Sequence, residues 1–350
     1  MQIQKNRGEH RKLGVALVGV GEYVVDQVIP ALQETQYCEL KGLVSSEPEK
    51  LGPLKEQYQL PEENIYSYDR FDEISDNPGI DIVYIVLPNS MHVEYCIRAA
   101  KAGKHIICEK PMAVNRVECL DIIEAVEQAG VRFSMGYRLH FDPHHIEMMR
   151  LGQQELFGPV KRMILHNSMD IKDSSPWRLD KKLSGGGPLM NNGVYCVQAA
   201  IYLSGQFPTA VEARFAPITD RKRFKEVEEG IEWTFYFDNG LEAHCETSYT
   251  KDQNLMRVEA ERGWFELSPA FAYDGLKGKT SEGEISFEPV NQQATQMDDF
   301  ALCILTDRET RVPPEMGLRD VVIMEAIYRA AKTGERIKLE LQQYATSPEY

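Results

Sequence analysis

The chain has 350 residues, of which 43% are hydrophobic and 27% are charged, so it is long enough for two soluble globular domains. Lysine and arginine together number 39 and aspartate and glutamate 54, which gives a formal net charge of −15. This acidic balance argues against nucleic acid or an anionic membrane as the main partner.

Cysteine use and the lack of long apolar stretches indicate a cytoplasmic protein. The seven cysteines are widely spaced and form no Cys-x-x-Cys pair, so we expect reduced, buried thiols. No apolar stretch approaches the length of a membrane span. Residues 1–12 are polar and lack the apolar core of a signal peptide, and we interpret them as an N-terminal arm.

Residues 13–136 alternate between strand and helix patterns. The expected strands are 13–19, 38–44, 64–68, 80–87, 105–108 and 131–137, and the expected helices are 22–33, 92–101 and 117–129. The run 80–87 is almost entirely apolar, as in a parallel strand covered on both faces. The alternation predicts an α/β fold in which 13–136 form a Rossmann domain with a doubly wound parallel sheet.

The pattern changes after Tyr137 to longer strands. The expected strands are 160–171, 210–218, 232–237, 241–248, 255–260 and 264–267, with a hairpin turn at Asp238-Asn239-Gly240. A late helix is expected at 320–331, and a loop or hairpin at 272–283. Residues 137–350 are therefore predicted to form a C-terminal α+β domain, for substrate binding and dimerisation, on a large open and mainly antiparallel sheet.

The first strand-to-helix turn carries the start of a dinucleotide-binding fingerprint. Gly19 allows a tight turn, and Gly21 lets the backbone approach a pyrophosphate at the helix N-terminus. Val24 stands where the fingerprint has its third glycine. The strand-turn-helix context favours dinucleotide binding, with Glu22 and Tyr23 beside the glycines, over a plain tight turn.

The end of the second strand predicts which dinucleotide is preferred. NAD-binding chains commonly place an acidic residue here for the ribose 2′-hydroxyl, whereas this chain has Ser45 and Ser46, followed by Lys50. Hydroxyls and an ammonium group can hold a 2′-phosphate, so the pattern favours NADP, with NAD possible. Two alternatives remain: Glu47 as the acidic residue, and a serine that only caps the next helix.

The tripeptide Glu109-Lys110-Pro111 follows the short apolar strand 105–108. A lysine at the carboxyl end of a parallel strand faces the crevice in which open α/β sheets bind ligands. Proline restricts the backbone of Lys110, and the bond between the two residues can be cis. A surface lysine in a turn fits the tripeptide alone, but its place after the fifth strand makes Lys110 a candidate catalytic residue.

The fourth strand ends at Leu87-Pro88-Asn89, and His92 follows. Asn89 can cap the next helix, and the same position also lies against the nicotinamide half of a dinucleotide in this kind of sheet. His140 and His144 have a spacing that suits a metal site. We expect no metal there, because Pro143 interrupts the helix between them and no further ligands follow. Domain packing or substrate contact is favoured.

Trp177-Arg178 precede a run of three glycines, 185–187, after which a helix is expected. Asn191 and Tyr195 are four residues apart and share one face of that helix. Tyrosine can transfer a proton when a nearby lysine ammonium lowers its pKa. A glycine loop followed by a buried structural tyrosine is the alternative.

Together these motifs resemble the glucose-fructose oxidoreductase, inositol dehydrogenase and MocA (Gfo/Idh/MocA) family, most closely its glucose-fructose oxidoreductase branch. The likeness covers nearly the whole chain, including 16–23, 43–45, 65–68, 84–92, 103–105, 109–113, 136–138, 177–179 and 185–195. The resemblance implies a nicotinamide cofactor and hydride transfer to or from a sugar or polyol. It also implies a homodimer or homotetramer built through the open sheet.

The resemblance implies that Lys110 binds the substrate hydroxyl and tunes Tyr195, the acid-base residue. With the motifs above, it predicts a cofactor site made of Gly19, Gly21, Glu22, Tyr23, Ser45, Ser46, Lys50, Tyr68, Leu87, Pro88, Asn89, His92, Glu109, Lys110, Arg138, Trp177 and Arg178. The predicted substrate contacts are Lys110, Arg138, His140, Trp177, Asn191 and Tyr195.

Asn191 departs from the family pattern, which has aspartate at this position. Asparagine keeps the shape of the side chain but carries no charge and accepts no proton at neutral pH. We therefore expect an NADP-preferring oxidoreductase in which this substitution alters the site. The alternative is a nicotinamide-binding protein with weak or no catalysis.

Overall fold

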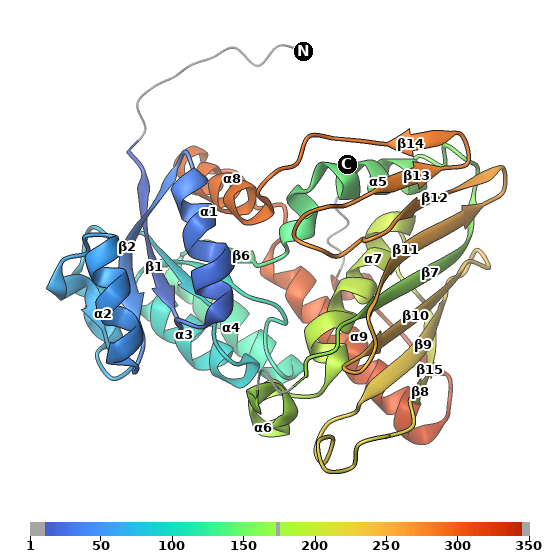
Figure 1. Ribbon diagram of the computed structural model, residues 1–350, viewed down its shortest axis with the longest axis horizontal. Coiled ribbons are helices and arrows are strands. Elements are labelled where there is room, and N and C mark those ends of the chain that lie inside the picture. The colour runs from blue at the N-terminus through green and yellow to red at the C-terminus, as the bar shows by residue number, and fades with distance from the viewer. Residues whose placement is uncertain (1–10, 173–175, 345–350) are drawn as a thin grey trace.

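The computed structural model describes residues 11–172 and 176–344 of the chain (Figure 1). Two sheets with their helices lie side by side in this view. Most of the predicted N-terminal arm, residues 1–10, lies outside the described residues. Arg11, at its end, forms an ion pair with Asp81 of the first domain.

The first sheet has six parallel strands in the order β3-β2-β1-β4-β5-β6, which confirms the doubly wound sheet. Its strands are β1 (Leu13–Val18), β2 (Cys38–Val44), β3 (Ile65–Tyr66), β4 (Ile82–Ile85), β5 (His105–Cys108) and β6 (Phe133–Met135). All four residues of β4 are fully buried, as expected for a strand covered on both faces.

Local signals explain where several helices of this half begin and end. The Asn115 side chain caps α4 by accepting from Glu118 N at 3.0 Å, and Gly130 ends the helix in the left-handed region. The helices of this half are η1 (Val24–Val28), α1 (Ile29–Glu34), α2 (Pro48–Gln57), η2 (Glu62–Asn64), η3 (Phe71–Asp76), η4 (Asn89–Met91), α3 (His92–Lys101) and α4 (Arg116–Ala129).

The second sheet has nine strands in the order β14-β13-β12-β11-β7-β10-β9-β8-β15. Neighbouring strands are antiparallel except β7 and β10, which confirms the mainly antiparallel sheet. Its strands are β7 (Val160–Ser168), β8 (Ala210–Phe215), β9 (Gly230–Tyr236), β10 (Glu242–Ser248), β11 (Gln253–Ala260), β12 (Gly263–Leu267), β13 (Gly278–Thr280), β14 (Gly283–Ile285) and β15 (Ile337–Lys338).

Helices α5, α7 and α9 lie between this sheet and the first domain, and the opposite face of the sheet has no helix over it in Figure 1. Burial alternates accordingly along β10, where Ala243 and Cys245 are buried and His244 is half-buried. The helices of this half are η5 (Arg138–Phe141), α5 (Pro143–Gln153), η6 (Pro176–Leu179), α6 (Lys181–Ser184), η7 (Leu189–Gly193), α7 (Val194–Ser204), α8 (Gln292–Thr306), α9 (Pro314–Thr333) and η8 (Gln342–Tyr344).

The helices that the sequence prediction missed include α2, α5 and α8. Pro143 begins α5 rather than interrupting a helix, because the Asp142 carboxylate caps it by accepting from His144 N at 2.9 Å. Helix α8 was not predicted, since Gln292 and Gln296 are buried and break its apolar pattern.

Helix α8 returns from the end of the chain to the first domain, where it lies beside α1 (Figure 1). Met297 and Phe300 pack into the same apolar cluster as Leu17 of β1. The Asp298 carboxylate accepts from the backbone N–H of Gln36 and Tyr37, with the latter bond at 2.8 Å. The first domain is therefore completed by a segment from the last sixth of the chain.

Candidate active site

Lys110 follows β5 and meets the second domain at the carboxyl edge of the first sheet. The bond between Lys110 and Pro111 is cis. Lys110 Nζ donates to the backbone oxygen of Asn191 at 2.8 Å, and it lies 4.9 Å from the centre of the Tyr195 ring. The predicted catalytic residues Lys110, Asn191 and Tyr195 are thus brought together, although they come from different domains.

Arg138 completes this group, which we name the Lys110 cluster (Lys110, Arg138, Asn191 and Tyr195). The buried guanidinium of Arg138 lies 5.3 Å from the centre of the Tyr195 ring and 4.2 Å from that of Tyr273. It also donates to the backbone oxygens of Phe271, at 2.6 Å, and Ala272, at 3.0 Å. These bonds tie the loop after β12 to the cluster.

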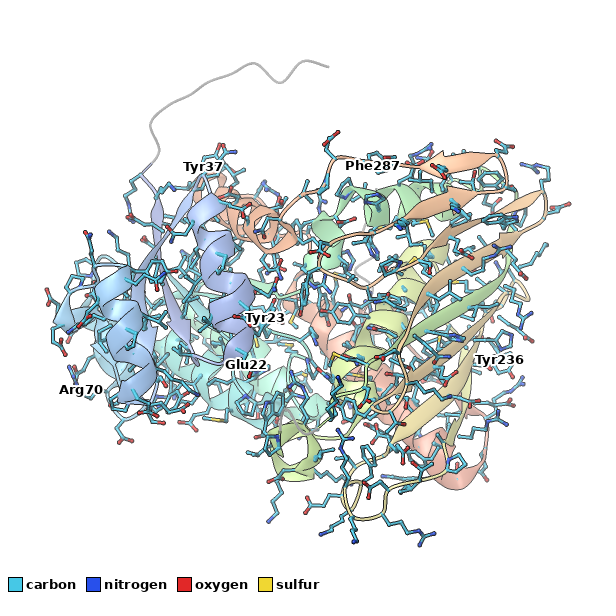
Figure 2. The ribbon with its side chains drawn as sticks, viewed as in Figure 1. Glu22, Tyr23, Tyr37, Arg70, Tyr236 and Phe287 are labelled. Atoms are coloured by element: carbon cyan, nitrogen blue, oxygen red, sulfur yellow. The ribbon has the colours of Figure 1, made fainter. Side chains whose placement is uncertain are left out.

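Glu109 connects the cluster to the dinucleotide turn. Its carboxylate accepts hydrogen bonds from the hydroxyl of Tyr84 at 2.8 Å and from that of Tyr23 at 3.2 Å. Tyr23 lies at the start of the first helix, on the side that faces the second domain (Figure 2), and its ring centre is 6.1 Å from that of Tyr273. The predicted cofactor residues Tyr23 and Glu109 are therefore in direct contact.

Burial sets the charge states of the cluster. The pKa of Lys110 is lowered to about 8, first by burial and then by Arg178 and Arg138, while Glu109 acts in the opposite sense. Burial raises the pKa of Tyr195, against the opposing effect of Arg138. Desolvation therefore raises the pKa of Tyr195, whereas the sequence predicted that a lysine ammonium would lower it.

The turn between β1 and η1 has the shape that a dinucleotide requires. Gly19 has φ +89°, and a Cβ there would lie 2.2 Å from the backbone oxygen of Val86. A Cβ on Gly21 would meet no atom within 4 Å, so this glycine faces open space. Open space in front of a glycine at the start of a helix fits the approach of a pyrophosphate.

The end of β2 holds the residues expected to choose between NADP and NAD. Ser45 is buried, and its hydroxyl accepts from the backbone N–H of Glu47 at 3.1 Å. Ser46 is exposed, and Lys50 forms an ion pair of 2.7 Å with Glu47. The ammonium group of Lys50 is therefore present at this edge, but a carboxylate accompanies it.

The turn after β4 reaches the second domain through Asn89, whose side-chain amide donates to the backbone oxygen of Ser184 at 2.8 Å. His92, at the start of α3, is 1% exposed, and both of its ring nitrogens face backbone oxygens. It has no polar atom left for direct contact with a cofactor. Leu87 and Pro88 lie between these two residues and β4.

The remaining predicted residues are Trp177, Arg178, Tyr68, Glu22 and His140, and their contacts differ. Arg178 stacks on Trp177 in η6, with 4.8 Å between the guanidinium carbon and the ring centre. Tyr68 packs against Tyr95, and Glu22 is exposed at the dinucleotide turn. His140 does not join the cluster, because its side chain is fully buried in the core, with its ring 5.4 Å from that of Tyr202.

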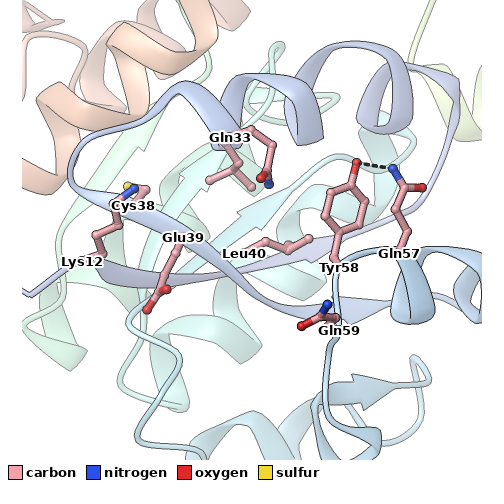
Figure 3. Close-up of a pocket in the computed structure, with 9 residues that line it drawn as sticks. Lys12, Gln33, Cys38, Glu39, Leu40, Gln57, Tyr58 and Gln59 are labelled. Atoms are coloured by element: carbon pink, nitrogen blue, oxygen red, sulfur yellow. Dashed lines mark hydrogen bonds between the residues drawn. The ribbon is translucent and has the colours of Figure 1, made fainter.

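A separate cavity of about 320 Å³ lies near the amino end of β2 (Figure 3). Its lining includes Lys12, Gln33, Glu39 and Tyr58. None of the predicted site residues lines it, and it lies at the edge of the sheet opposite the Lys110 cluster. We therefore do not assign the reaction to this cavity.

Comparison with known proteins decides the family. Residues 13–137 match a model described as the oxidoreductase family with an NAD-binding Rossmann fold, and residues 145–266 match the GFO/IDH/MocA C-terminal domain. The chain belongs to the Gfo/Idh/MocA oxidoreductase family. The sequence-based resemblance is confirmed, and the protein is an oxidoreductase with a nicotinamide-dinucleotide-binding domain.

Several members of the family are similar over nearly their full length. The crystal structure of aldose-aldose oxidoreductase from Caulobacter crescentus, complexed with glycerol, is 42% identical, with a TM-score of 0.91 over 94% of this chain and 100% of that one. D-xylose 1-dehydrogenase (NADP(+)) from Haloarcula marismortui is 29% identical over 93% of this chain and 92% of the relative. D-glucoside 3-dehydrogenase from Escherichia coli is 26% identical over 93% of this chain and 97% of the relative.

Three residues near the site of this Gfo/Idh/MocA protein were not singled out from the sequence. Tyr273 lies in a loop without a periodic pattern, and Tyr84 lies in a buried strand, where its hydroxyl was the only signal. Glu228 accepts from Gly187 N at 2.9 Å and from the Tyr328 hydroxyl at 2.8 Å, and so holds the glycine turn that leads to Asn191.

Proposed function

We propose that the protein transfers hydride between a nicotinamide dinucleotide, preferably NADP, and a CH–OH or carbonyl carbon of a sugar, polyol or related compound. The observation that carries this proposal is the Lys110–Tyr195 pair beside the glycine turn and at the carboxyl edge of the parallel sheet. The names of the relatives, which include a xylose dehydrogenase and an aldose-aldose oxidoreductase, support this substrate class.

The proton accompanying the hydride is assigned to Tyr195 and Lys110. A bound nicotinamide supplies the hydride acceptor or donor. Because burial raises its pKa, Tyr195 stays protonated and can donate to a carbonyl oxygen that is being reduced. In the oxidative direction a base is needed, and Lys110, with a pKa of about 8, loses its proton more readily than Tyr195. Arg138 holds the Tyr195 ring in place.

The cofactor is proposed to bind along the carboxyl ends of β1, β2, β4 and β5. Gly19 and Gly21 would approach its pyrophosphate, and Asn89 and Glu109 would flank the nicotinamide end. The NADP preference rests on Ser45, Ser46 and Lys50, and the name of the Haloarcula relative supports it. The Glu47 carboxylate opposes it, since a 2′-phosphate must share Lys50 with that group.

The proposal is tested by titrating purified protein with NADPH and NADH, followed by fluorescence or calorimetry. We expect NADPH to bind roughly tenfold more tightly, which corresponds to one charge-assisted contact. Ser46→Asp should reverse the preference, because a carboxylate repels the 2′-phosphate and accepts from a ribose hydroxyl. Ser75→Asp, at another exposed serine far from this edge, serves as the control. Absence of binding by either nucleotide would refute the proposal.

The substrate class is tested by screening aldoses, polyols and dihydrodiols with both nucleotides. Turnover of two sugars with a cofactor that stays bound would indicate an oxidoreductase like the aldose-aldose relative. Turnover with an exchanging cofactor would indicate an ordinary dehydrogenase or reductase. Either result agrees with the proposal, whereas cofactor binding without turnover of any of these compounds contradicts its substrate class.

A second candidate is a nicotinamide-binding protein with weak or no catalysis. It is favoured by Asn191, which brings no carboxylate to Lys110 and accepts from Lys110 only through its backbone oxygen. Asn191→Asp distinguishes the two. A large gain in turnover supports a weakened enzyme, whereas cofactor binding without turnover in both forms supports the binding protein.

We also propose that the chain acts in the cytoplasm and as a homodimer or homotetramer, with the boundary between its domains near residue 136. All seven cysteines are unpaired and buried, which suits a reducing compartment. Across residues 11–172 and 176–344, no helix is both long and apolar enough to cross a membrane. The outer face of the second sheet is the proposed subunit contact, and sedimentation of the purified protein tests it.

A further inference from the structure

His92 is a buried histidine held between two backbone oxygens. Its Nδ1 lies 2.9 Å from the oxygen of Pro111, and its Nε2 lies 2.9 Å from the oxygen of Leu87. The side chain is 1% exposed, so water does not replace either partner. Both partners are carbonyl oxygens, which accept hydrogen bonds and cannot donate them.

This geometry determines the protonation state. A neutral imidazole carries one N–H, so one of its nitrogens would turn a lone pair toward a carbonyl oxygen at 2.9 Å. The imidazolium ion carries two N–H groups and satisfies both oxygens. The position of His92 in the first turn of α3 works against a positive charge, so the two carbonyls must outweigh the helix dipole.

His145 shows the opposite arrangement within the same molecule. Its Nε2 lies 2.8 Å from the oxygen of Ala270, but its Nδ1 lies 2.9 Å from the Tyr202 hydroxyl, which can donate. One N–H is therefore enough, and burial lowers the pKa of His145 to about 4. Burial acts on His92 as well, but Cys108 and the two carbonyls raise its pKa to about 9.

The two carbonyls belong to the segments that surround the proposed nicotinamide end. Leu87 precedes Pro88 and Asn89, and Pro111 follows Lys110 directly in the chain. We infer that His92 is a positioning residue that is held as an imidazolium ion and ties the Leu87–Asn89 turn to the Lys110–Pro111 turn. It acts on the reaction through Lys110 and Asn89 and does not touch the cofactor itself. This role rests on the proposed function of those two turns.

His92 shares its buried surroundings with a group of cysteines. The titratable side chain that faces it is Cys108 of β5, which in turn interacts with Cys96 of α3 and Cys119 of α4. Burial raises the pKa of Cys108 and of Cys119, while His92 lowers that of Cys108 and Cys108 raises that of His92, so His92 and Cys108 titrate as a pair. Loss of the His92 proton should therefore release one of the two turns as the pH passes about 9.

The charge state is tested by NMR of protein labelled with ¹⁵N in its histidine rings, without cofactor. We expect both His92 nitrogens to show imidazolium shifts between about pH 7 and 8.5, and His145 to show one protonated and one bare nitrogen. The backbone amides of Asn89 and Lys110 should move with the same midpoint as the His92 ring. One bare His92 nitrogen at pH 7 would overturn the inference, whether or not the protein binds a nucleotide.

The positioning role is tested by the NADPH affinity of His92→Gln. A glutamine amide can donate to one carbonyl but repels the other, so we expect roughly tenfold weaker binding at pH 7.5. In the wild type, the affinity for NADPH should fall as the pH passes about 9, because one of the two turns is released. This fall should be absent from His92→Gln. His105→Gln, at the opposite end of β5, should bind as wild type. Wild-type affinity and pH dependence in His92→Gln would overturn the role, and should that variant fail to fold, the wild-type titration of the Asn89 and Lys110 amides decides.

Discussion

Lys110 and Tyr195 owe their proposed roles to the burial that shifts both of their pKa values. Near neutral pH, Lys110 is mostly charged and Tyr195 is protonated, which suits the donation of a proton to a carbonyl oxygen. Removal of a proton from a hydroxyl requires the opposite state. The two directions of the reaction should therefore differ in their pH dependence.

Substitution of Lys110 by arginine tests this at a single residue. In the wild type, the rate of substrate oxidation should rise with a midpoint near pH 8, as Lys110 becomes neutral. In Lys110→Arg this rise should disappear, because a guanidinium stays protonated up to about pH 12, and turnover should fall roughly 100-fold or more. The measurement is kcat as a function of pH, with Lys101→Arg, on the exposed end of α3, as the control. An unchanged midpoint in Lys110→Arg would assign the titration to another group.

Asn191→Asp should shift the midpoint of the same rise in oxidation rate with pH. A carboxylate beside the ammonium favours its charged form, so the pKa of Lys110 should rise above about 8. The midpoint of the oxidation rate should then shift toward higher pH. The shift is read from kcat against pH, or from the ¹⁵N signal of the Lys110 side chain. Asn167→Asp, at a buried asparagine on β7 that donates to the oxygen of Asn192, controls for an added buried charge. An unchanged midpoint would show that the side chain of residue 191 does not face Lys110.

The sequence predicted a set of site residues that the structure partly brings together, but it did not predict the orientations of their side chains. Lys110, Asn191 and Tyr195 could be found because each follows a strand end or a glycine run with a known consequence. His92 and His140 were expected to contact ligands, yet both are buried, because a sequence does not tell which side of a turn a side chain takes. Tyr273 reaches the Lys110 cluster from a loop, and the residues around it in the sequence show no pattern that predicts this position.

At the scale of the element, the turn between β1 and η1 contains two glycines, of which Gly19 has no room for a side chain and Gly21 has room for one. Gly19→Ala would place a Cβ 2.2 Å from a backbone oxygen and force a residue with φ +89°, so we expect several degrees of loss in Tm. Gly21→Ala meets no atom within 4 Å, so its Tm should stay at the wild-type value. Its affinity for NADPH should nevertheless fall roughly tenfold or more, because the methyl group occupies the path of the pyrophosphate.

Thermal unfolding and nucleotide titration of the two variants provide the comparison, and each variant is the control for the other. A stable Gly19→Ala protein, or an unstable Gly21→Ala protein, would contradict the geometry of this turn. Wild-type affinity in Gly21→Ala would place the cofactor elsewhere.

Most elements could be predicted because their periodicity is local. Strands of the first sheet such as β1 and β4 are short apolar runs that are buried throughout. Strands of the second sheet such as β9 and β10 alternate with a period of two, and helix α3 follows a period of 3.6 residues. Helix α8 escaped prediction because three glutamines, at 292, 293 and 296, are buried, and two of them donate hydrogen bonds: Gln292 to Asp142 of the second domain and Gln293 to Tyr23 of the first. One of them, Gln292, accepts from Arg138. A polar residue at such a junction satisfies a partner that lies more than 100 residues away, which no local window reveals.

At the scale of the whole molecule, three buried histidines make the folding stability depend on pH in opposite directions. Burial lowers the pKa of His140 to about 3 and that of His145 to about 4, so in acid the unfolded chain binds protons that the folded chain does not. Stability should then fall as the pH drops below about 6.5, by up to roughly 1.4 kcal/mol per pH unit for each histidine. His92 has a raised pKa, so its contribution is complete below about 6.5 and is lost as the pH rises through about 9.

Urea unfolding at about pH 5, 6.5 and 9 should therefore show the greatest stability in the middle of this range. In His92→Gln the alkaline loss should shrink while the acid loss remains, and in His145→Gln the reverse should hold. Stability that keeps rising through pH 9 would contradict this account.

The return of α8 to the first domain has a consequence for how the chain is made. The ribosome completes the last strand of the first sheet at Met135, but the helix that covers the cluster around Leu17 ends only at Thr306. At synthesis rates of about 5–20 residues per second, this interval lasts on the order of ten seconds or more. During that time the apolar surface beside α1 stays open to solvent. The nascent chain thus has a window in which a chaperone can bind the first domain before its own C-terminal segment does.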